Sequence, residues 1–336
     1  MATMLYHNGP AVSVLVAARN EETNIGACLA ALLDQEFLPE RFEIWVGDDD
    51  SQDHTAFIVN EMRKSDPRIH LLPISEKRTG MPGKANVLAQ LAHYAKGDLI
   101  LITDADVRVG TGWIRTMVEC FTPDIDMISG VVTLYGRSLF AQLQNADWLF
   151  FAAECTKKSD AGQPVTALGC NMGIRAEVYR SVGGYENIPF SVTEDYELFR
   201  VVTEAGYGFR SVLQKEILAT SYPVRSFADL LRQRRRWLTG SFRKNWRFIL
   251  SFNLNGLYFP ALILLGIVVS WPAAGILFLF KWLKDLFFLR KVYDKLELPY
   301  TILIALYPLY TVVCHFIFLF IQFDPIPVRW KGRTYQ

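Results

Sequence analysis

The stretch Leu99-Ile-Leu-Ile-Thr-Asp-Ala-Asp106 joins a short apolar run to a pair of carboxylates. An apolar run of this length between polar segments is typical of a β-strand. Residues two apart in extended backbone lie on the same side of the strand, so Asp104 and Asp106 can converge on one ligand. Whether this strand belongs to a ligand-binding sheet depends on the runs that precede it.

Strand-like runs alternate with helical patterns through the first two-thirds of the chain. Before the run at 99–103, the strand-like runs are Val12–Ala17, Phe42–Val46 and Ile69–Leu72. An order of strand, helix, strand and helix predicts an α/β fold with a mainly parallel sheet. Such sheets bind ligands at the carboxyl ends of their strands.

Acidic residues gather where these elements end or begin. Asp48, Asp49 and Asp50 follow the second run, Asp104 and Asp106 follow the fourth, and Glu194 and Asp195 precede a helical stretch. Mg²⁺ and Mn²⁺ bind hard oxygen ligands and need only one or two carboxylates when a diphosphate supplies others. A single Asp-x-Asp is more often a pair of surface acids that cap a turn. Three clusters in one chain raise the odds of a metal–diphosphate site but do not decide between it and surface acids.

Basic residues suited to a diphosphate occur in two places. A departing diphosphate develops negative charge, which donors in the protein must stabilise. Gln233-Arg-Arg-Arg-Trp237 supplies planar guanidinium donors. Lys84, in Gly80-Met-Pro-Gly-Lys-Ala-Asn86, is a second candidate, although a solvated lysine in a loop would have the same spacing.

Hydrophobicity is concentrated in the last third of the chain. Hydrophobic residues form 51% of the sequence and charged residues 21%, and the mean hydropathy is +0.16. Residues 248–280 and 298–323 contain no charged side chain. A membrane span needs about 20 apolar residues, and a buried core helix rarely needs such length. Trp271-Pro272 interrupts the first run, so we expect two or three membrane segments, and the flanking positive charges do not decide between them.

A basic amphipathic segment, residues 225–247, precedes these runs. Its apolar residues recur at helical spacing, and its one acid is Asp229. A basic helix with tryptophans is typical of the membrane interface, and a solvated helix is the alternative. We therefore predict a catalytic domain over 1–224, an interface region over 225–247, and a membrane region over 248–336 that ends in the Trp330-Lys-Gly-Arg333 tail. The basic residues of the interface region are Arg225, Arg232, Arg234, Arg235, Arg236, Arg243, Lys244 and Arg247.

The cysteines and the first residues predict the compartment of the protein, whereas the net charge predicts no partner. Lys+Arg 35 against Asp+Glu 34 gives a net charge of +1, which by itself says nothing about partners. We expect no nucleic-acid partner. The five cysteines form no Cys-x-x-Cys pair, which fits a reducing compartment. Residues 1–10 lack a charged start followed by an apolar run, so we expect no signal peptide and a cytoplasmic catalytic domain.

These motifs, in this order, resemble those of the membrane-associated members of glycosyltransferase family 2, which have the GT-A fold with its Rossmann-like sheet. The resemblance covers nearly the whole chain. Val16-Ala-Ala-Arg-Asn-Glu-Glu22 is similar to the first-strand motif that lines the nucleoside pocket. Asp48-Asp-Asp-Ser51 is similar to Asp-Asp-Gly-Ser, with Asp50 in place of the glycine. The other matching segments are Gly83-Lys-Ala-Asn86, Asp104-Ala-Asp106, Gly169-Cys-Asn-Met-Gly-Ile-Arg175, Thr193-Glu-Asp195 and Gln233-Arg-Arg-Arg-Trp237.

The resemblance implies which residues bind the donor. Arg19, Glu21 and Asp49 would hold the nucleoside, with Asp49 hydrogen-bonded to the base. Asp104 and Asp106 would bind Mn²⁺ or Mg²⁺, with Asp106 in direct contact. The remaining residues that would bind the diphosphate, close the site or contact the acceptor are Lys84, Gln233, Arg236 and Trp237.

The resemblance also implies the chemistry. Asp195, beside Glu194, would remove the proton from an acceptor hydroxyl, and a single displacement would invert the anomeric centre. Trp330-Lys-Gly-Arg-Thr-Tyr335 and the short membrane region resemble the ceramide glucosyltransferase-like branch, whose enzymes move one hexose onto a lipid.

We therefore expect a non-processive transfer from a UDP- or GDP-hexose to a membrane lipid. The protein would be a multi-pass protein that contacts the lipid bilayer of the cell inner membrane. One alternative is a subunit of a processive polysaccharide synthase, although two or three spans are few for a polymer conduit. The other alternative is a non-catalytic membrane scaffold.

Overall fold

The computed structural model describes residues 10–76, 81, 83–189, 191–240, 246–321, 328–330 and 333–335. The chain divides into two compact units. The first comprises Met1–Thr133 and Glu154–Tyr222, and the second comprises Leu134–Ala153 and Pro223–Gln336. The sequence patterns predict boundaries after residues 224 and 247, and give no sign that residues 134–153 group with the second unit.

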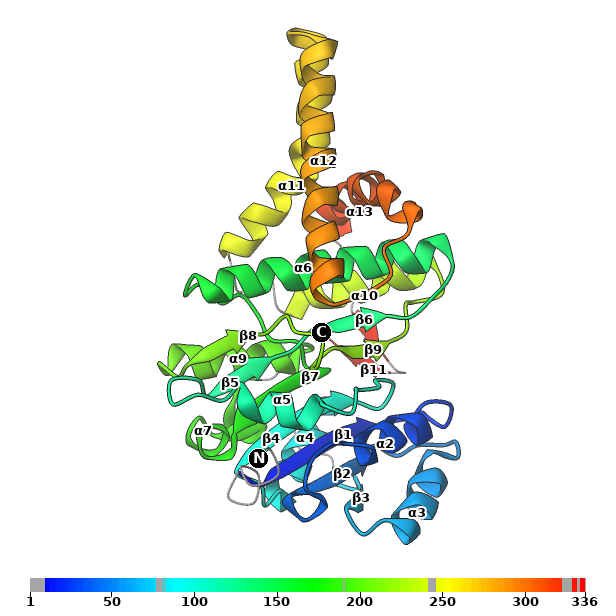
Figure 1. Ribbon diagram of the computed structural model, residues 1–336, viewed down its shortest axis with the longest axis vertical. Helices are drawn as coiled ribbons and strands as arrows, with labels where there is room; N and C mark the ends of the chain where they lie inside the picture. Colours follow the sequence, from blue (N-terminus) through cyan, green and yellow to red (C-terminus); the bar gives the residue numbers. More distant parts are fainter. Residues whose placement is uncertain are drawn as a thin grey trace. The chain divides into compact units, whose positions relative to one another are not determined.

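The first unit is built on a seven-stranded sheet (Figure 1). Its strand order is β3-β2-β1-β4-β7-β5-β8, in which β1 to β4 are parallel and β7 is antiparallel to both of its neighbours. The predicted α/β fold with a mainly parallel sheet is thus confirmed. The strands are β1 (Val12–Ala18), β2 (Phe42–Asp48), β3 (Ile69–Pro73), β4 (Leu99–Asp104), β5 (Met127–Ser129), β7 (Asn171–Arg175) and β8 (Phe209–Ser211).

Both faces of this sheet are covered by helices. Along β4, Leu99 and Leu101 pack with one group of helices (α2, α3 and α5), whereas Ile100 and Ile102 pack with another (α4, α7 and α9). This alternation is the period of two that a pleated strand imposes. The strand is therefore apolar at each position from Leu99 to Ile102. The helices are α2 (Ile25–Leu33), α3 (Thr55–Ser65), α4 (Lys84–Tyr94), α5 (Trp113–Glu119), α7 (Ala176–Ser181), α8 (Gly184–Asn187) and α9 (Glu194–Glu204), with the 3₁₀ turn η1 at Pro39–Arg41.

The register of the parallel strands brings their acidic ends to one edge. Ala18 of β1 pairs with Asp48 at the end of β2, and Ala17 pairs with Asp104 at the end of β4. The segments that follow these three neighbouring strands therefore emerge side by side. A small separate sheet pairs β6 (Val132–Leu134) with β9 (Ala219–Ser221).

The second unit is mainly helical. Its apolar core includes Leu230 and Leu238 of α10 and Cys314 and Phe318 of α13. The elements are α6 (Leu139–Asp160, of which the first part belongs to this unit), α10 (Phe227–Gly240), α11 (Trp246–Val268), α12 (Trp271–Lys295), the 3₁₀ turn η3 (Ile302–Leu306), α13 (Tyr307–Ile321) and the antiparallel strands β10 (Val328–Trp330) and β11 (Arg333–Tyr335).

Helix α10 covers Phe227–Gly240 of the basic amphipathic segment predicted over 225–247, and part of its apolar face packs against α13. Arg243 and Lys244 lie outside the described residues, as do Lys331 and Gly332 of the predicted tail.

The described residues contain fewer candidate membrane spans than the sequence predicts. Among the described residues, one segment, Ile302–Ile321, is long and apolar enough to cross a membrane, with a mean hydropathy of 2.2. The apolar part of α11, Asn253–Val268, is shorter, and α12 carries Lys281, Lys284 and Asp285. The expectation of two or three spans in a multi-pass protein is therefore not supported.

Candidate functional site

The loops that follow β1 and β2 hold each other at the carboxyl edge of the sheet. Arg19 Nη1 donates to the main-chain oxygen of Asp49 at 2.5 Å and lies 3.8 Å from the Asp49 carboxylate. The backbone N–H of Glu21 donates to Oγ1 of Thr55 at 2.7 Å. The three residues predicted to hold the nucleoside thus lie on two adjacent loops.

Asp50 makes the turn for which the related motif uses glycine. Its φ is 59°, in the left-handed region, which aspartate tolerates better than most residues. The side-chain amide of Gln52 donates to the main-chain oxygen and the carboxylate of Asp50 at 3.1 and 3.2 Å. Asn20 has a φ of 53°, and its side-chain oxygen accepts from the backbone N–H of Gln52 at 2.8 Å. These contacts fix the two loops to one another.

Lys84 bridges the acid at the end of β4 and the acid at the start of α9. Its Nζ lies 2.5 Å from Oδ1 of Asp104 and 3.2 Å from Oε1 of Glu194, and it donates to the main-chain oxygen of Gly169 at 3.3 Å. Burial alone would lower the pKa of Lys84, but the charges of Asp104 and Glu194 raise it. The lysine is therefore a fixed cation between two carboxylates.

Asp195 lies beside this bridge. Its carboxylate accepts from the backbone N–H groups of Gly169 and Tyr196, each at 2.8 Å. Burial and the charge of Glu194 raise the pKa of Asp195 to about 6, although Lys84 and the two N–H groups oppose the shift. A carboxylate with this pKa is ionised at neutral pH and basic enough to accept a proton from a reacting hydroxyl.

Gly169 is required where it stands because the aspartate is so close. A Cβ added there would lie 2.7 Å from the Cβ of Asp195 and 2.9 Å from its Oδ2. Any larger residue would displace the carboxylate.

Asp106 belongs to the same neighbourhood. Its Oδ2 accepts from Oγ of Ser221 at 3.4 Å. Burial raises the pKa of the Cys170 thiol well above its usual value, and the charges of Asp104, Asp195 and Asp106 raise it further. The charges of the three carboxylates therefore all act on one buried thiol.

Asp104 and Asp106, at and just after the end of β4, carry the kind of ligand that a divalent cation binds. Among the described residues, no cluster of three or more histidine, cysteine or acidic side chains forms a ready-made metal cage. Mg²⁺ and Mn²⁺ do not need one, since water and phosphate oxygens complete their coordination. Asp104 and Asp106 present hard oxygen donors at the edge of the sheet, and Lys84 already holds a positive charge against Asp104. The residues therefore fit a metal bound together with a diphosphate.

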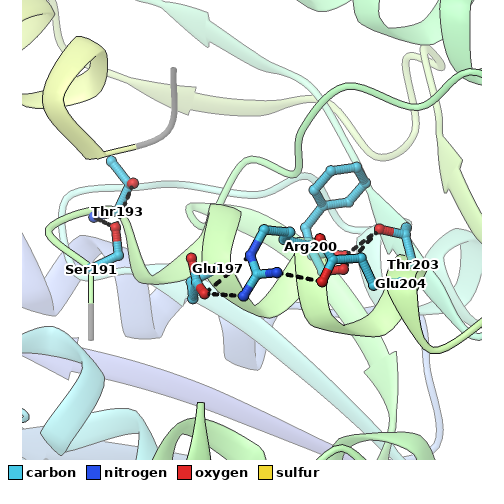
Figure 2. Close-up of polar contacts among 7 residues, drawn as sticks. Ser191, Thr193, Glu197, Arg200, Thr203 and Glu204 are labelled. Atoms are coloured by element: carbon cyan, nitrogen blue, oxygen red, sulfur yellow. Dashed lines mark hydrogen bonds and ion pairs between the residues drawn. The ribbon is translucent and has the colours of Figure 1, made fainter. Parts of the chain in front are cut away.

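Ion pairs along α9 stabilise the helix that carries Glu194 and Asp195. Figure 2 shows Arg200 between Glu197 and Glu204, with Nη2 2.5 Å from Oε1 of Glu197. The Glu197 side chain is only 1% exposed, so the pair is anchored in the interior. In the loop before the helix, the hydroxyls of Ser191 and Thr193 lie 3.2 Å apart. These contacts fix the backbone from which Glu194 and Asp195 project.

The predicted diphosphate-binding residues Gln233, Arg236 and Trp237 lie on α10 in the second unit, and all three are half-buried. The ring of Trp237 lies against that of Trp148, with centroids 4.9 Å apart. The structure thus gathers the site residues of the first unit, while the role of these three stays a prediction.

Two residues near these groups were not found by sequence reasoning. Asp147 of α6 pairs with Arg234 of α10 at 2.5 Å. The hydroxyl-bearing Tyr185 of α8 is 2% exposed, and burial together with the charges of Glu194 and Asp195 raises its pKa. Neither residue lies in a motif, and only the long-range packing reveals them.

The mainly parallel sheet, with acids and Lys84 at its carboxyl edge, agrees with the GT-A fold that the motifs suggest. The profile of glycosyl transferase family 21 matches residues 2–336, and the chain belongs to this family. That match does not establish membership of family 2, the family number that the motifs suggest.

Relatives with assigned activities share about half of their length with this chain. It is 29% identical to the beta-monoglucosyldiacylglycerol synthase of Trichormus variabilis, over 72% of this chain and 52% of that protein. It is 27% identical to an N-acetylglucosaminyltransferase of Sinorhizobium fredii, over 70% of this chain and 58% of that protein.

A solved structure supports the fold over nearly the whole chain. The mannosyltransferase PcManGT from Pyrobaculum calidifontis, in complex with GDP-Man and Mn²⁺, superposes with a TM-score of 0.60 at 18% identity. The match covers 91% of this chain and 87% of that one. The GT-A fold is thereby confirmed.

Proposed function

We propose that the protein is an inverting, non-processive hexosyltransferase that moves a hexose from a nucleotide diphosphate sugar to a hydroxyl of a membrane lipid. The observation that carries this proposal is the bridge from Asp104 through Lys84 to Glu194, next to Asp195. It joins the two groups that the reaction needs, an acidic cluster for a metal-bound diphosphate and a carboxylate that can accept a proton. Family membership and the diacylglycerol-directed relative support the lipid acceptor.

Donor binding is assigned to the loops after β1, β2 and β4. Arg19, Glu21 and Asp49 would hold the nucleoside of a UDP- or GDP-hexose. Asp104 and Asp106 would hold Mn²⁺ or Mg²⁺, which, when bound, supplies positive charge that stabilises the departing diphosphate. The motif residues of α10 that would bind the diphosphate or the acceptor are Gln233, Arg236 and Trp237.

Asp195 is assigned the proton transfer, with Glu194 held by Lys84 beside it. The acceptor hydroxyl gives its proton to Asp195 while its oxygen forms a bond to the anomeric carbon. The bond from that carbon to the diphosphate oxygen breaks on the opposite face, and the electron pair leaves with the diphosphate. One displacement of this kind inverts the anomeric centre.

We place the reaction at the cytoplasmic face of the cell inner membrane. The apolar segment Ile302–Ile321 supports an association with a bilayer. A lipid hydroxyl at a membrane surface arrives with restricted orientation, which lowers the entropic part of the barrier.

The test is a panel of UDP- and GDP-hexoses incubated with purified protein, extracted membrane lipids and Mn²⁺, with the products identified by mass spectrometry. We expect a lipid carrying a single hexose, formed only when divalent metal is present. Asp195→Asn should lower turnover by about 10²–10⁴-fold because positioned proton transfer contributes that much. Donor binding should survive in this variant. Near-wild-type turnover in Asp195→Asn, or products with many sugars, would contradict the proposal.

A further inference from the structure

Helices α11 and α12 of the second unit form a long hairpin and run side by side (Figure 1). The hydroxyl of Tyr258 on α11 donates to the main-chain oxygen of Leu277 on α12 at 2.9 Å. The rings of Phe259 and Phe278 meet edge to face, with centroids 5.8 Å apart. The two helices thus contact each other through side chains on their facing sides.

The outer surface near the turn of this hairpin is apolar. Ile267, Val268 and Val269 are 68%, 70% and 69% exposed. Single exposed apolar residues are common, but a contiguous patch of them marks an interaction surface. The other large apolar side chains exposed near the turn are Ile263, Leu264, Trp271, Ile276, Leu277, Leu279 and Phe280.

The turn between the helices satisfies several of its own backbone N–H groups. The N–H groups of Val269 and Ser270 both donate to the main-chain oxygen of Leu265, at 2.9 and 3.0 Å. Oγ of Ser270 accepts from the backbone N–H of Ala273 at 3.4 Å, and Pro272 has no N–H to satisfy. Satisfied N–H groups are what a turn in hydrocarbon requires, since no solvent is present there to accept a hydrogen bond.

Charged residues on α12 indicate how far the hairpin can enter a lipid bilayer. The uncharged stretch Trp271–Phe280 spans about 15 Å at about 1.5 Å per residue. Lys281, which pairs with Asp285, follows this stretch. Trp282 and the exposed Lys284 come next along the helix. The hydrocarbon core of a bilayer is about 30 Å thick, so the uncharged stretch matches one leaflet. Lysine and tryptophan are the residues that favour the headgroup level.

We infer that the α11–α12 hairpin enters one leaflet of a lipid bilayer and returns, with its turn in the hydrocarbon and Lys281 and Lys284 at the headgroups. The inference rests on the membrane association in the proposed function and not on its chemistry. A complete crossing by α12 would draw the exposed Lys284 into the hydrocarbon, where charge is unfavourable. The competing occupant of the apolar patch is a second copy of this chain.

Depth measurements on proteoliposomes test the inference. Val268→Cys and Lys291→Cys each carry an NBD fluorophore on the new thiol, and the wild-type chain, labelled in parallel, gives the background from the native cysteines. We expect the Val268 probe to be quenched by lipids with a nitroxide deep in the acyl chain and to resist iodide on either side of the membrane. The Lys291 probe should be quenched by iodide.

Three results would overturn the inference. Iodide quenching of the Val268 probe from the side of the catalytic unit would place the turn in water. Quenching only from the opposite side would indicate a complete crossing. Energy transfer between labelled copies, without quenching by the nitroxide lipids, would show that a second chain covers the patch.

A matched pair of variants adds a binding measurement. Val268→Asp should lower the partition of the protein into vesicles about 100-fold because a carboxylate in hydrocarbon is unfavourable. Phe57→Asp, on α3 of the first unit and 62% exposed in the native chain, should leave partition unchanged. Equal partition of the two variants would contradict the inference. Transfer to detergent-dispersed lipid, measured separately, reports on the proposed function, and its failure leaves the depth measurement valid.

Discussion

Asp195 combines two influences that act in opposite directions on its proton affinity. Two backbone N–H groups and Lys84 favour the carboxylate, while burial and the neighbouring Glu194 disfavour it, and the balance raises its pKa to about 6. A base with a much lower pKa would be a poor proton acceptor, and one with a much higher pKa would be protonated in the cell. The value fits the role proposed for Asp195.

The raised pKa predicts the pH dependence of transfer. A general base must be ionised, so kcat/KM should be constant above about pH 6 and fall about tenfold per pH unit below it. A bound divalent cation favours the carboxylate and would move the midpoint to lower pH. Steady-state kinetics from pH 5 to 9 at saturating Mn²⁺ check this. A kcat/KM that rises as the pH falls through this range would rule out Asp195 as the base.

Asp50 allows a prediction about stability. An L-residue other than glycine in the left-handed region loses about 1–2 kcal/mol, and aspartate loses less than a branched residue. Asp50→Val should therefore lower the free energy of unfolding by about 1–2 kcal/mol, whereas Asp50→Gly should change it by less than about 1 kcal/mol. Thermal unfolding of the two variants measures the difference. Equal melting temperatures would show that the φ of 59° imposes no constraint.

The second unit relies on a link between two of its helices. Arg234 of α10 donates to Asp147 of α6 at 2.5 Å, and its guanidinium lies 4.6 Å from the centroid of the Trp237 ring. Trp237 in turn lies against Trp148, the residue that follows Asp147. The arginine-rich motif thus uses one of its arginines to position its own tryptophan. The sequence, by contrast, suggests that all three arginines are available to phosphate.

Removing this ion pair should loosen α10. Asp147→Leu leaves Arg234 half-buried without its carboxylate, and we expect a loss of about 3 kcal/mol in unfolding free energy. The double variant Asp147→Leu/Arg234→Met should recover much of that loss, because replacing both partners of a buried pair by apolar residues is often neutral. Thermal unfolding in detergent compares the three chains. A double variant no more stable than Asp147→Leu would show that the pair is not the source of the effect.

At the scale of the whole molecule, donor binding should stabilise the fold. A ligand at 100 times its Kd adds about 2.7 kcal/mol to the free energy of unfolding, which raises the melting temperature by several degrees. We expect UDP or GDP to have this effect only with Mn²⁺ or Mg²⁺ present.

The metal ligands can be checked in the same assay. Asp106→Asn should abolish the metal-dependent part of the shift, because it removes a hard anionic ligand. Glu61→Gln, an exposed acid on α3, is the matched control and should retain the full shift. An undiminished shift in Asp106→Asn would require other metal ligands.

Much of the fold of the first unit could be predicted because the sequence patterns that indicate its strands and helices are local. Runs such as Val12–Ala18 and Leu99–Asp104 are apolar at nearly every position, which fits a strand covered on both faces, and each is separated from the next by a helical pattern. Parallel strands joined by helices put their carboxyl ends at one edge, so the gathering of Asp49 and Asp104 there could be expected.

The membrane region could not be predicted equally well, because apolar length does not distinguish lipid from protein as a partner. Leu230 and Leu238 have the spacing of an interfacial helix, yet they pack against Cys314 and Phe318. The charged residues inside α12 and the short apolar part of α11 leave one candidate span among the described residues, Ile302–Ile321.

The sequence by itself determined the parallel sheet and the acids at its edge, since alternating local patterns and right-handed connections leave few other folds. Only the tertiary structure decided that Lys84 pairs with Asp104 and Glu194, that Gly169 holds Asp195, and that Arg234 pairs with Asp147. Each of these contacts joins residues far apart in the chain. Their free energies depend on distance and burial, which no local pattern encodes.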